Sequence, residues 1–326
     1  LGTAVRVAGG RITRRRRRAA SRYRRGSCQP LLIAFTAIIT PFTPDGRSID
    51  LGRLDAQIAR QAEGGITGLV VAGTTGESPT LDEAEFRTLV RHCVEVGKVH
   101  DLVVVAGTGS NSTAHAVQLQ RIALDLGADA GLSVTPYYNK PTQDGLYAHF
   151  ATIAESVELP IMLYNIPART GVALEPSTIE RLYESPWVVS VKEATGSTDS
   201  ASEILARCPG IALLSGDDSM TLPFMALGGV GCVSVVSNID PQRIAALCQA
   251  MLDRDVLAAR EQHQVLFELA RAMFLETNPI CVKAALAMMN LDSGQLRLPM
   301  TQPTDETKHA LHGVLQRARL LETAVY

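Results

Sequence analysis

Eight short runs of apolar, mostly β-branched residues recur along this chain between residues 31 and 237. Each run is bounded by Gly, Pro, Asn or Asp. Apolarity within a run is continuous, as expected of a strand that is covered on both faces. The segments between the runs have helical spacing instead. The runs are Leu31–Ile39, Gly68–Ala72, Leu102–Gly107, Gly131–Thr135, Ile161–Asn165, Val188–Lys192, Ile211–Ser215 and Gly231–Ser237.

Eight strand–helix units match the (β/α)8 barrel in number and length. An open doubly wound sheet is the alternative, but no G-x-G-x-x-G turn follows the first run. After Asp255 no further strand is expected, and three amphipathic helices are predicted over Val256–Leu275, Ile280–Met289 and Thr304–Thr323. We therefore predict an α/β fold: a (β/α)8 TIM barrel over residues 31–255 and a small C-terminal three-helix domain over residues 256–326.

The first thirty residues differ from the rest in charge. Ten of the 31 basic residues are arginines between Arg6 and Arg25, and no acidic residue occurs before Asp45. A nucleic-acid-binding arm, a transit peptide and the charged region of a secretory signal are all compatible with such a segment. We favour a disordered extension, or an over-extended reading frame, for residues 1–30 and exclude it from the fold argument.

The amino-acid composition argues against several classes of protein. Hydrophobic residues make up 46% of the chain, which argues against a disordered protein, and no run approaches the length of a membrane-spanning helix. Without the arginine-rich segment, 21 basic residues face 33 acidic ones, so nucleic-acid binding is not expected. The six cysteines lie far apart without a CxxC pair, which is typical of reduced thiols in a cytoplasmic protein.

Chemically distinctive residues follow the predicted strands, at the end where barrel enzymes carry their chemistry. Lys192 is the most informative of them, because it ends the apolar run Trp187–Val191. Burial there favours the uncharged amine, which is a nucleophile toward carbonyls and forms a Schiff base. A lysine that reaches out to solvent, or one paired with Glu193, is the structural alternative.

Four further strand-end residues fit such a site. Tyr164 ends the preceding strand and is a candidate proton carrier. Thr74 and Thr75 lie in a glycine-flanked turn that suits a carboxylate, and Arg169 suits bidentate carboxylate recognition. Each also has a simpler interpretation, as a turn, core or surface residue. No metal site is predicted, because the histidines are scattered and Asp217-Asp218 fits a strand-end turn.

Three motifs, in this order, resemble one family: Gly73-Thr-Thr-Gly-Glu-Ser78, Tyr164-Asn-Ile-Pro-Ala-Arg-Thr-Gly171 and Val191-Lys-Glu-Ala-Thr-Gly196. The chain is similar, from about Ile33 to Leu320, to the pyruvate-dependent class I aldolase-type barrels of the dihydrodipicolinate synthase/N-acetylneuraminate lyase superfamily. Thr74, Arg169 and the segment Val134–Pro141 favour the synthase branch. Aldolases for 2-keto-3-deoxy sugar acids and N-acetylneuraminate lyase are the alternatives within this superfamily.

The resemblance implies a lyase of lysine and diaminopimelate biosynthesis that condenses pyruvate with L-aspartate 4-semialdehyde to 4-hydroxy-tetrahydrodipicolinate. Lys192 would hold pyruvate as an imine, and Tyr164, Thr75 and Tyr138 would form a hydroxyl relay. Substrate-binding roles follow for a second set: Thr74, Thr75, Arg169, Gly216 and Val233. Tyr138 would come from a neighbouring subunit, which implies a homo-oligomer, either a dimer or a dimer of dimers. No metal or organic cofactor is implied.

One departure from the family concerns feedback inhibition. In lysine-inhibited relatives, two histidines and a glutamate hold the effector at the dimer interface. The matching positions here carry Glu83, Phe86 and His115, although Asn111 and Tyr137 are retained. Because the carboxylate that pairs with the effector's ammonium is missing, we expect weak or absent inhibition by L-lysine.

Overall fold

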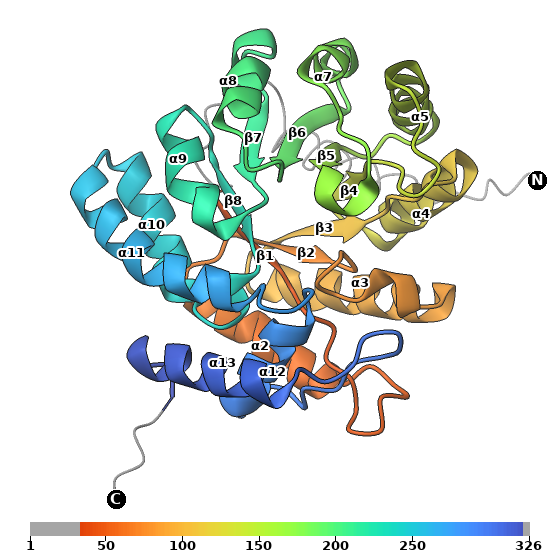
Figure 1. Cartoon of the computed structure of the whole chain (residues 1–326). Coiled ribbons are helices and arrows are strands. Elements are labelled where there is room, and N and C mark those ends of the chain that lie inside the picture. Colours follow the sequence, from red (N-terminus) through yellow and green to blue (C-terminus); the bar gives the residue numbers. More distant parts are fainter. Residues whose placement is uncertain (1–32, 322–326) are drawn as a thin grey trace, which may run out of the picture.

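The computed structural model describes residues 33–321 and contains eight parallel strands that close into a barrel in chain order (Figure 1). Pairing of β1 with both β2 and β8 closes the sheet. The predicted barrel is therefore confirmed, whereas the predicted extension over residues 1–30 lies outside the described residues. The strands are β1 (Ala34–Ala37), β2 (Gly68–Val71), β3 (Val103–Gly107), β4 (Ala130–Val134), β5 (Ile161–Asn165), β6 (Val188–Glu193), β7 (Ala212–Ser215) and β8 (Gly231–Ser234).

Helices surround the barrel and cover the outer faces of its strands (Figure 1). None of the helices within residues 33–321 has the length and apolarity needed to cross a membrane. The helices are α2 (Leu51–Glu63), α3 (Glu83–Val99), α4 (Thr113–Leu126), α5 (Gln143–Ser156), α6 (Pro167–Thr170), α7 (Pro176–Tyr183), α8 (Thr198–Arg207), α9 (Thr221–Ala226), α10 (Pro241–Leu252), α11 (Val256–Ala272), α12 (Ile280–Met288) and α13 (Asp305–Arg317). Short 3-10 turns are η1 (Ser78–Thr80), η2 (Asp218–Met220) and η3 (Val236–Asn238).

Local signals explain where the helices begin and which face they bury. α3 starts at a capping box, in which the Asp82 carboxylate accepts from the backbone N–H of Glu85 and the Glu85 side chain accepts from that of Asp82. Its predicted apolar stripe packs on the barrel: Phe86, Leu89 and Cys93 are buried. Amphipathic spacing thus places α3 beside the end of β2, where the active-site turn begins.

The three C-terminal helices share one hydrophobic core with β1, β8 and α10. Figure 1 shows α11 beside α10, and α12 and α13 beside α2. The prediction that the second of them is amphipathic is wrong, because every residue of α12 from Ile280 to Leu286 is buried. This helix contacts both η3 and α13, and only its last residues, Ala287 and Met288, are partly exposed. A separate domain boundary at residue 255 stays a prediction.

His149 on α5 gives the fold a pH dependence that is independent of the active site. Burial lowers the pKa of His149 from 6.5 to about 4. Its Nδ1 contacts the Thr113 hydroxyl at 2.9 Å, while Nε2 has no hydrogen-bond partner among the described residues. Below pH 6.5 the unfolded chain therefore binds a proton that the folded chain does not, and stability falls as the pH drops toward 4.

We expect this histidine alone to lower the free energy of unfolding by about 2 kcal/mol between pH 7 and about pH 4.5. Urea unfolding of the wild type and of His149→Asn at both pH values measures the difference. The variant is expected to lose less stability than the wild type over this interval. Equal losses in the two proteins would show that His149 does not contribute.

Candidate active site

A cavity of about 580 Å³ opens at the carboxyl ends of the barrel strands. Six of the residues predicted from the sequence lie on its wall: Thr74, Thr75, Tyr164, Arg169, Lys192 and Gly216. The segment between α11 and α12, from Phe274 to Asn278, closes the cavity from outside the barrel. Residues from the ends of β2, β5, β6 and β7 are thus brought to one concave site, as is usual for sites in this architecture.

Lys192 points inward from β6 and is only 5% exposed. It is paired in register with Tyr164 on β5, and its Nζ lies 4.2 Å from the centroid of the tyrosine ring. Neither structural alternative applies: the side chain does not reach solvent, and Lys192 has no ion pair with any residue of the described range. A primary amine in this position can contact the carbonyl of a small ligand in the cavity.

Glu193 follows Lys192 but faces the opposite side of the strand, as successive strand residues do. Its carboxylate accepts hydrogen bonds from Asn165 Nδ2 at 3.0 Å and from the backbone N–H of Thr195 at 2.9 Å. Burial raises the pKa of Glu193, and these hydrogen bonds partly offset the shift. This carboxylate therefore fixes the loop after β6 and leaves the amine of Lys192 unpaired.

Gly216 provides the space that the lysine occupies. A Cβ atom at this position would lie 2.7 Å from Ala194 Cβ and 3.1 Å from Lys192 Cε, so a larger residue would push the lysine aside. The next residue, Asp217, also lines the cavity. Burial raises its pKa, and the charge of Lys192 acts in the opposite direction. Asp217 is thus the acidic group within electrostatic range of the amine.

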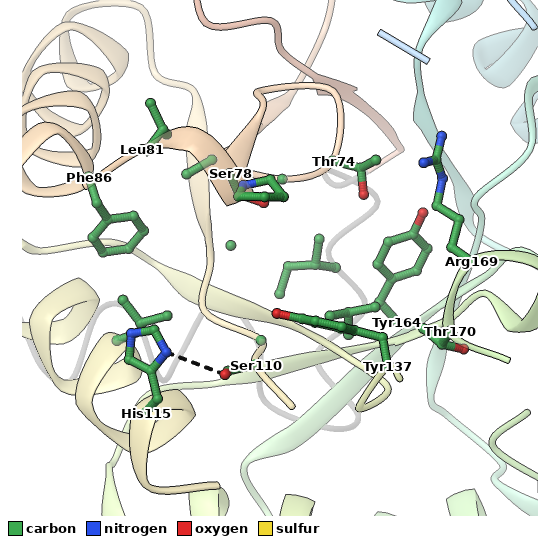
Figure 2. A pocket seen from close by; sticks show the side chains of 18 of the residues that line it. Thr74, Ser78, Leu81, Phe86, Ser110, His115, Tyr137, Tyr164, Arg169 and Thr170 are labelled. Atoms are coloured by element: carbon green, nitrogen blue, oxygen red, sulfur yellow. Dashed lines mark hydrogen bonds between the residues drawn. The ribbon is translucent and has the colours of Figure 1, made fainter. Parts of the chain in front are cut away.

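The two threonines occupy the turn after β2. The backbone N–H of Glu77 donates to Thr74 O, and the backbone N–H of Ser78 donates to Gly73 O, which closes the turn. Thr74 and Tyr164 both line the cavity, and Figure 2 shows their hydroxyl groups pointing toward one another. The hydroxyl of Thr75 is buried and accepts a hydrogen bond from Asn278 Nδ2 at 3.0 Å.

Residues from the C-terminal part of the chain hold this turn in place through Glu77. Glu77 adopts a left-handed conformation with φ 56°, which is unusual for a residue other than glycine. Its carboxylate accepts from Lys283 Nζ at 2.7 Å and from the backbone N–H of Arg297 at 3.0 Å. Lys283 is 0% exposed and also donates to Thr40 O.

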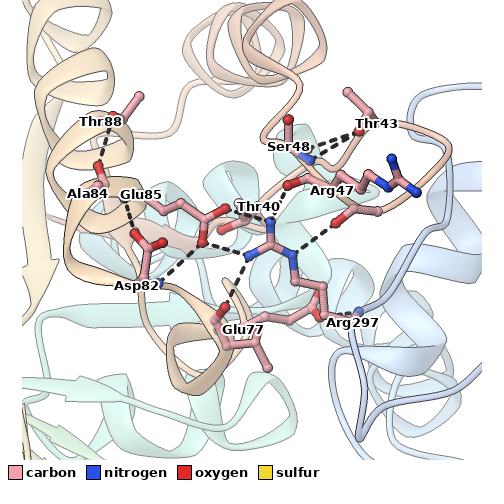
Figure 3. A network of polar contacts seen from close by, with 12 residues as sticks. Thr40, Thr43, Arg47, Ser48, Glu77, Asp82, Ala84, Glu85, Thr88 and Arg297 are labelled. Atoms are coloured by element: carbon pink, nitrogen blue, oxygen red, sulfur yellow. Dashed lines mark hydrogen bonds and ion pairs between the residues drawn. The ribbon is translucent and has the colours of Figure 1, made fainter.

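Arg297 extends the same support to the start of α3. Its guanidinium binds the Glu85 carboxylate through two hydrogen bonds of 2.6 and 2.7 Å (Figure 3). It also donates to the backbone carbonyls of Gly46, Arg47 and Thr80. Bidentate contacts of this kind fix geometry as well as adding stability. The turn after β2, which lines the cavity, is therefore held by a rigid frame.

Arg169 reaches the cavity from α6, a single helical turn after β5. Gly171 ends this turn in the left-handed conformation, with φ 75°, and its N–H donates to Pro167 O. The Arg169 Nη2 donates to the backbone oxygen of Asn278 at 3.2 Å. This contact holds the guanidinium over the cavity mouth, where its remaining N–H groups can bind a carboxylate.

Two predicted site residues lie elsewhere in this chain. Tyr138 is 89% exposed and does not line the cavity. It has a left-handed φ of 72°, and two hydrogen bonds hold its loop: Asn139 Nδ2 donates to Asn111 O, and Asn111 Nδ2 donates to Tyr137 O. Val233 is buried in the barrel interior below the cavity, and Val235 lines the wall in its place.

A second cavity, of about 480 Å³, shares a wall with the first. Figure 2 shows Tyr164 and Arg169 at one end of it and Phe86 and His115 at the other. Glu83 also lines this cavity, but its carboxylate is bound by Arg87 and by Gln118 Nε2. The three positions that depart from the lysine-inhibited pattern therefore face one space.

Sequence reasoning did not identify Asn278, Glu77 or Lys283 as parts of the site. The available signal was Lys283, a lysine inside the apolar segment of α12. A buried lysine requires a partner, and this one lies next to the active-site turn. No group of three or more His, Cys, Asp or Glu side chains within residues 33–321 is arranged to hold a metal ion.

A closed eight-stranded barrel with a buried lysine at the end of its sixth strand, unpaired among the described residues, is the arrangement expected of an enzyme of the class I aldolase type. Comparison with known proteins gives the family. The model of the dihydrodipicolinate synthetase family matches residues 31–318. The chain belongs to this family, and the predicted resemblance is confirmed.

Individual relatives agree with this assignment. The chain is 47% identical over 285 residues to the 4-hydroxy-tetrahydrodipicolinate synthase of Methanothrix thermoacetophila, covering 87% of this chain and 95% of the relative. The dihydrodipicolinate synthase of Aquifex aeolicus superposes with a TM-score of 0.86 at 42% identity, covering 90% of this chain and all of the other. The pyruvate complex of the Acinetobacter baumannii enzyme superposes with a TM-score of 0.87 at 39% identity, covering 89% of this chain and all of the other.

Proposed function

We propose that this enzyme is a 4-hydroxy-tetrahydrodipicolinate synthase, which condenses pyruvate with L-aspartate 4-semialdehyde. The observation that supports this proposal most directly is the position of Lys192. It is buried beside Tyr164, without an ion pair among the described residues, in a cavity that two threonines and an arginine also line. Family membership and the named relatives support the same activity. The alternative, an aldolase for sugar acids or N-acetylneuraminate lyase, has no comparable support.

The site residues divide the reaction between them. The amine of Lys192, after it has lost its proton, attacks the keto carbon of pyruvate, and loss of water leaves an imine. The protonated imine withdraws electrons, so that a methyl proton can leave and an enamine forms. Tyr164, which lies against the lysine, is placed to move protons to and from the reacting atoms. The turn at Thr74 and Thr75 binds the pyruvate carboxylate.

Arg169 binds the carboxylate of the second substrate at the cavity mouth. The enamine carbon attacks the aldehyde of L-aspartate 4-semialdehyde, which forms the new carbon–carbon bond. The amino group of this product then displaces Lys192 from the imine carbon, which closes the ring and returns the free enzyme. Holding both substrates in one cavity lowers the barrier through proximity and orientation.

Incubation with pyruvate followed by borohydride reduction tests the covalent step. We expect the intact protein to gain the mass of one reduced pyruvate adduct and peptide mapping to place it on Lys192. A coupled assay with pyruvate and L-aspartate 4-semialdehyde tests the complete reaction. An adduct without synthase turnover, together with cleavage of N-acetylneuraminate or a 2-keto-3-deoxy sugar acid, would favour the alternative instead.

The working unit is proposed to be a dimer or a dimer of dimers, located in the cytoplasm. Tyr138 supports the first point, since its exposed ring projects from a loop whose strained conformation is held in place. A second copy could receive this ring beside its own cavity. The cysteines of the described range support the second point, because all of them are buried and none of them forms a disulfide within that range.

Inhibition by L-lysine is expected to be weak or absent. In the second cavity, the carboxylate of Glu83 is already bound by Arg87 and Gln118, and His115 brings no carboxylate that could pair with an ammonium group. Titration of the coupled assay with L-lysine is expected to leave the rate above half its initial value at about 1 mM. His115→Glu is expected to increase sensitivity, and strong inhibition of the wild type would contradict the prediction.

A further inference from the structure

We infer that Asn278 is a positioning residue for the pyruvate carboxylate: its side-chain amide fixes the direction in which the Thr75 hydroxyl donates its proton. The inference rests on the proposed function and concerns the same site. Asn278 does not belong to the barrel. It lies two residues before the start of α12 at Ile280, yet it lines the active-site cavity. It therefore links the C-terminal helices to the substrate-facing turn.

The polarity of one hydrogen bond carries the argument. Asn278 Nδ2 lies 3.0 Å from Thr75 Oγ1, and an amide N–H can only donate. The hydroxyl oxygen is thus the acceptor, and its single proton stays free for another acceptor. Thr75 lines the cavity, and a carboxylate there can only accept. Asn278 thereby directs the threonine proton toward the carboxylate.

The side chain of Asn278 has no other use within the described part of the chain. It is 3% exposed, Thr75 is its only hydrogen-bond partner there, and its Oδ1 atom is unpaired. Burying an amide whose oxygen has no hydrogen-bond partner costs free energy of folding. Its presence here is therefore explained by the one hydrogen bond that it makes, to Thr75 in the cavity wall. Without the amide, the Thr75 hydroxyl could rotate and donate elsewhere, and the charge-assisted bond to the carboxylate would weaken.

The backbone of Asn278 supplies an internal control. Its carbonyl oxygen, not its side chain, accepts the hydrogen bond from Arg169 Nη2. A substitution of the side chain keeps this carbonyl, so the group that binds the second substrate stays in place. The Lys283–Glu77 pair holds α12 and the turn together independently of the Asn278 side chain. Loss of the amide should therefore affect one substrate and not the other.

Steady-state kinetics of Asn278→Ala test the inference. We expect the KM for pyruvate to rise about tenfold, as for loss of a hydrogen bond to a charged group, while the KM for L-aspartate 4-semialdehyde stays within about twofold of the wild type. Asn278→Asp keeps the size of the side chain but can only accept, and is expected to raise the pyruvate KM at least as much. Gln249→Ala, which removes an exposed amide on α10, is the matched control.

A double-mutant cycle with Thr75→Val separates positioning from direct contact. If Asn278 acts through the threonine hydroxyl, Asn278→Ala should change the pyruvate KM little in the Thr75→Val background. Equal effects in both backgrounds, a larger change for L-aspartate 4-semialdehyde, or wild-type kinetics of Asn278→Ala would each overturn the inference. Failure of the proposed function is distinguishable, because the wild type would then form no pyruvate adduct or no product.

Discussion

Replacing Lys192 with alanine is expected to lower the turnover of pyruvate and L-aspartate 4-semialdehyde by about 10⁴-fold or more, because no other group can form the imine. The described part of the chain has no second amine in the cavity. Folding should persist, since the lysine has no ion pair among the described residues and removal of its side chain relieves a buried amine of its desolvation. The coupled assay measures the loss, and borohydride trapping should find no adduct.

Two further variants show whether the activity is lost because the nucleophilic amine is missing. Lys192→Arg keeps a positive charge in the site but has no nucleophilic amine, so it should be as inactive as the alanine variant. Lys308→Ala removes an exposed lysine that pairs only with Asp305 in the described range, and it should keep wild-type kinetics. Substantial activity in Lys192→Arg would mean that the lysine acts through its charge and would refute covalent catalysis.

The barrel could be predicted because its determinants are local. Each strand is a continuous apolar run, each helix carries its own periodicity, and the number of units fixes the architecture. Lys192 was recognisable for the same reason, since the lysine directly follows the run that forms β6. Register then places Tyr164 beside Lys192, because adjacent parallel strands end at the same edge of the barrel.

The contacts that support the site could not be predicted, because they join distant parts of the chain. Asn278 and Thr75 are 203 residues apart in sequence, and Lys283 and Glu77 are 206 apart. Periodicity describes each segment separately and carries no information on such pairs. α12 was misjudged for a related reason: burial on all sides depends on which elements cover a helix.

Replacing Arg169 with alanine is expected to lower kcat/KM for L-aspartate 4-semialdehyde by about 10²- to 10³-fold while leaving imine formation with pyruvate close to that of the wild type. The guanidinium lies at the cavity mouth, where the carbonyl of Asn278 holds it. Loss of a bidentate contact to a carboxylate therefore weakens the second substrate alone. Substrate-dependent kinetics and borohydride trapping measure the two steps separately.

The conservative variant distinguishes geometry from charge. Arg169→Lys keeps the charge but lacks the planar fork, so its kcat/KM for the aldehyde should fall between those of the alanine variant and the wild type. Arg181→Ala is the matched control, because it removes an arginine whose guanidinium binds Asp144 and Tyr147 at the surface. If Arg169→Ala reduced pyruvate trapping as strongly as turnover, the arginine would serve the first substrate. The assignment of the cavity mouth to a second, carboxylate-bearing substrate would then be wrong, even though the lysine chemistry would stand.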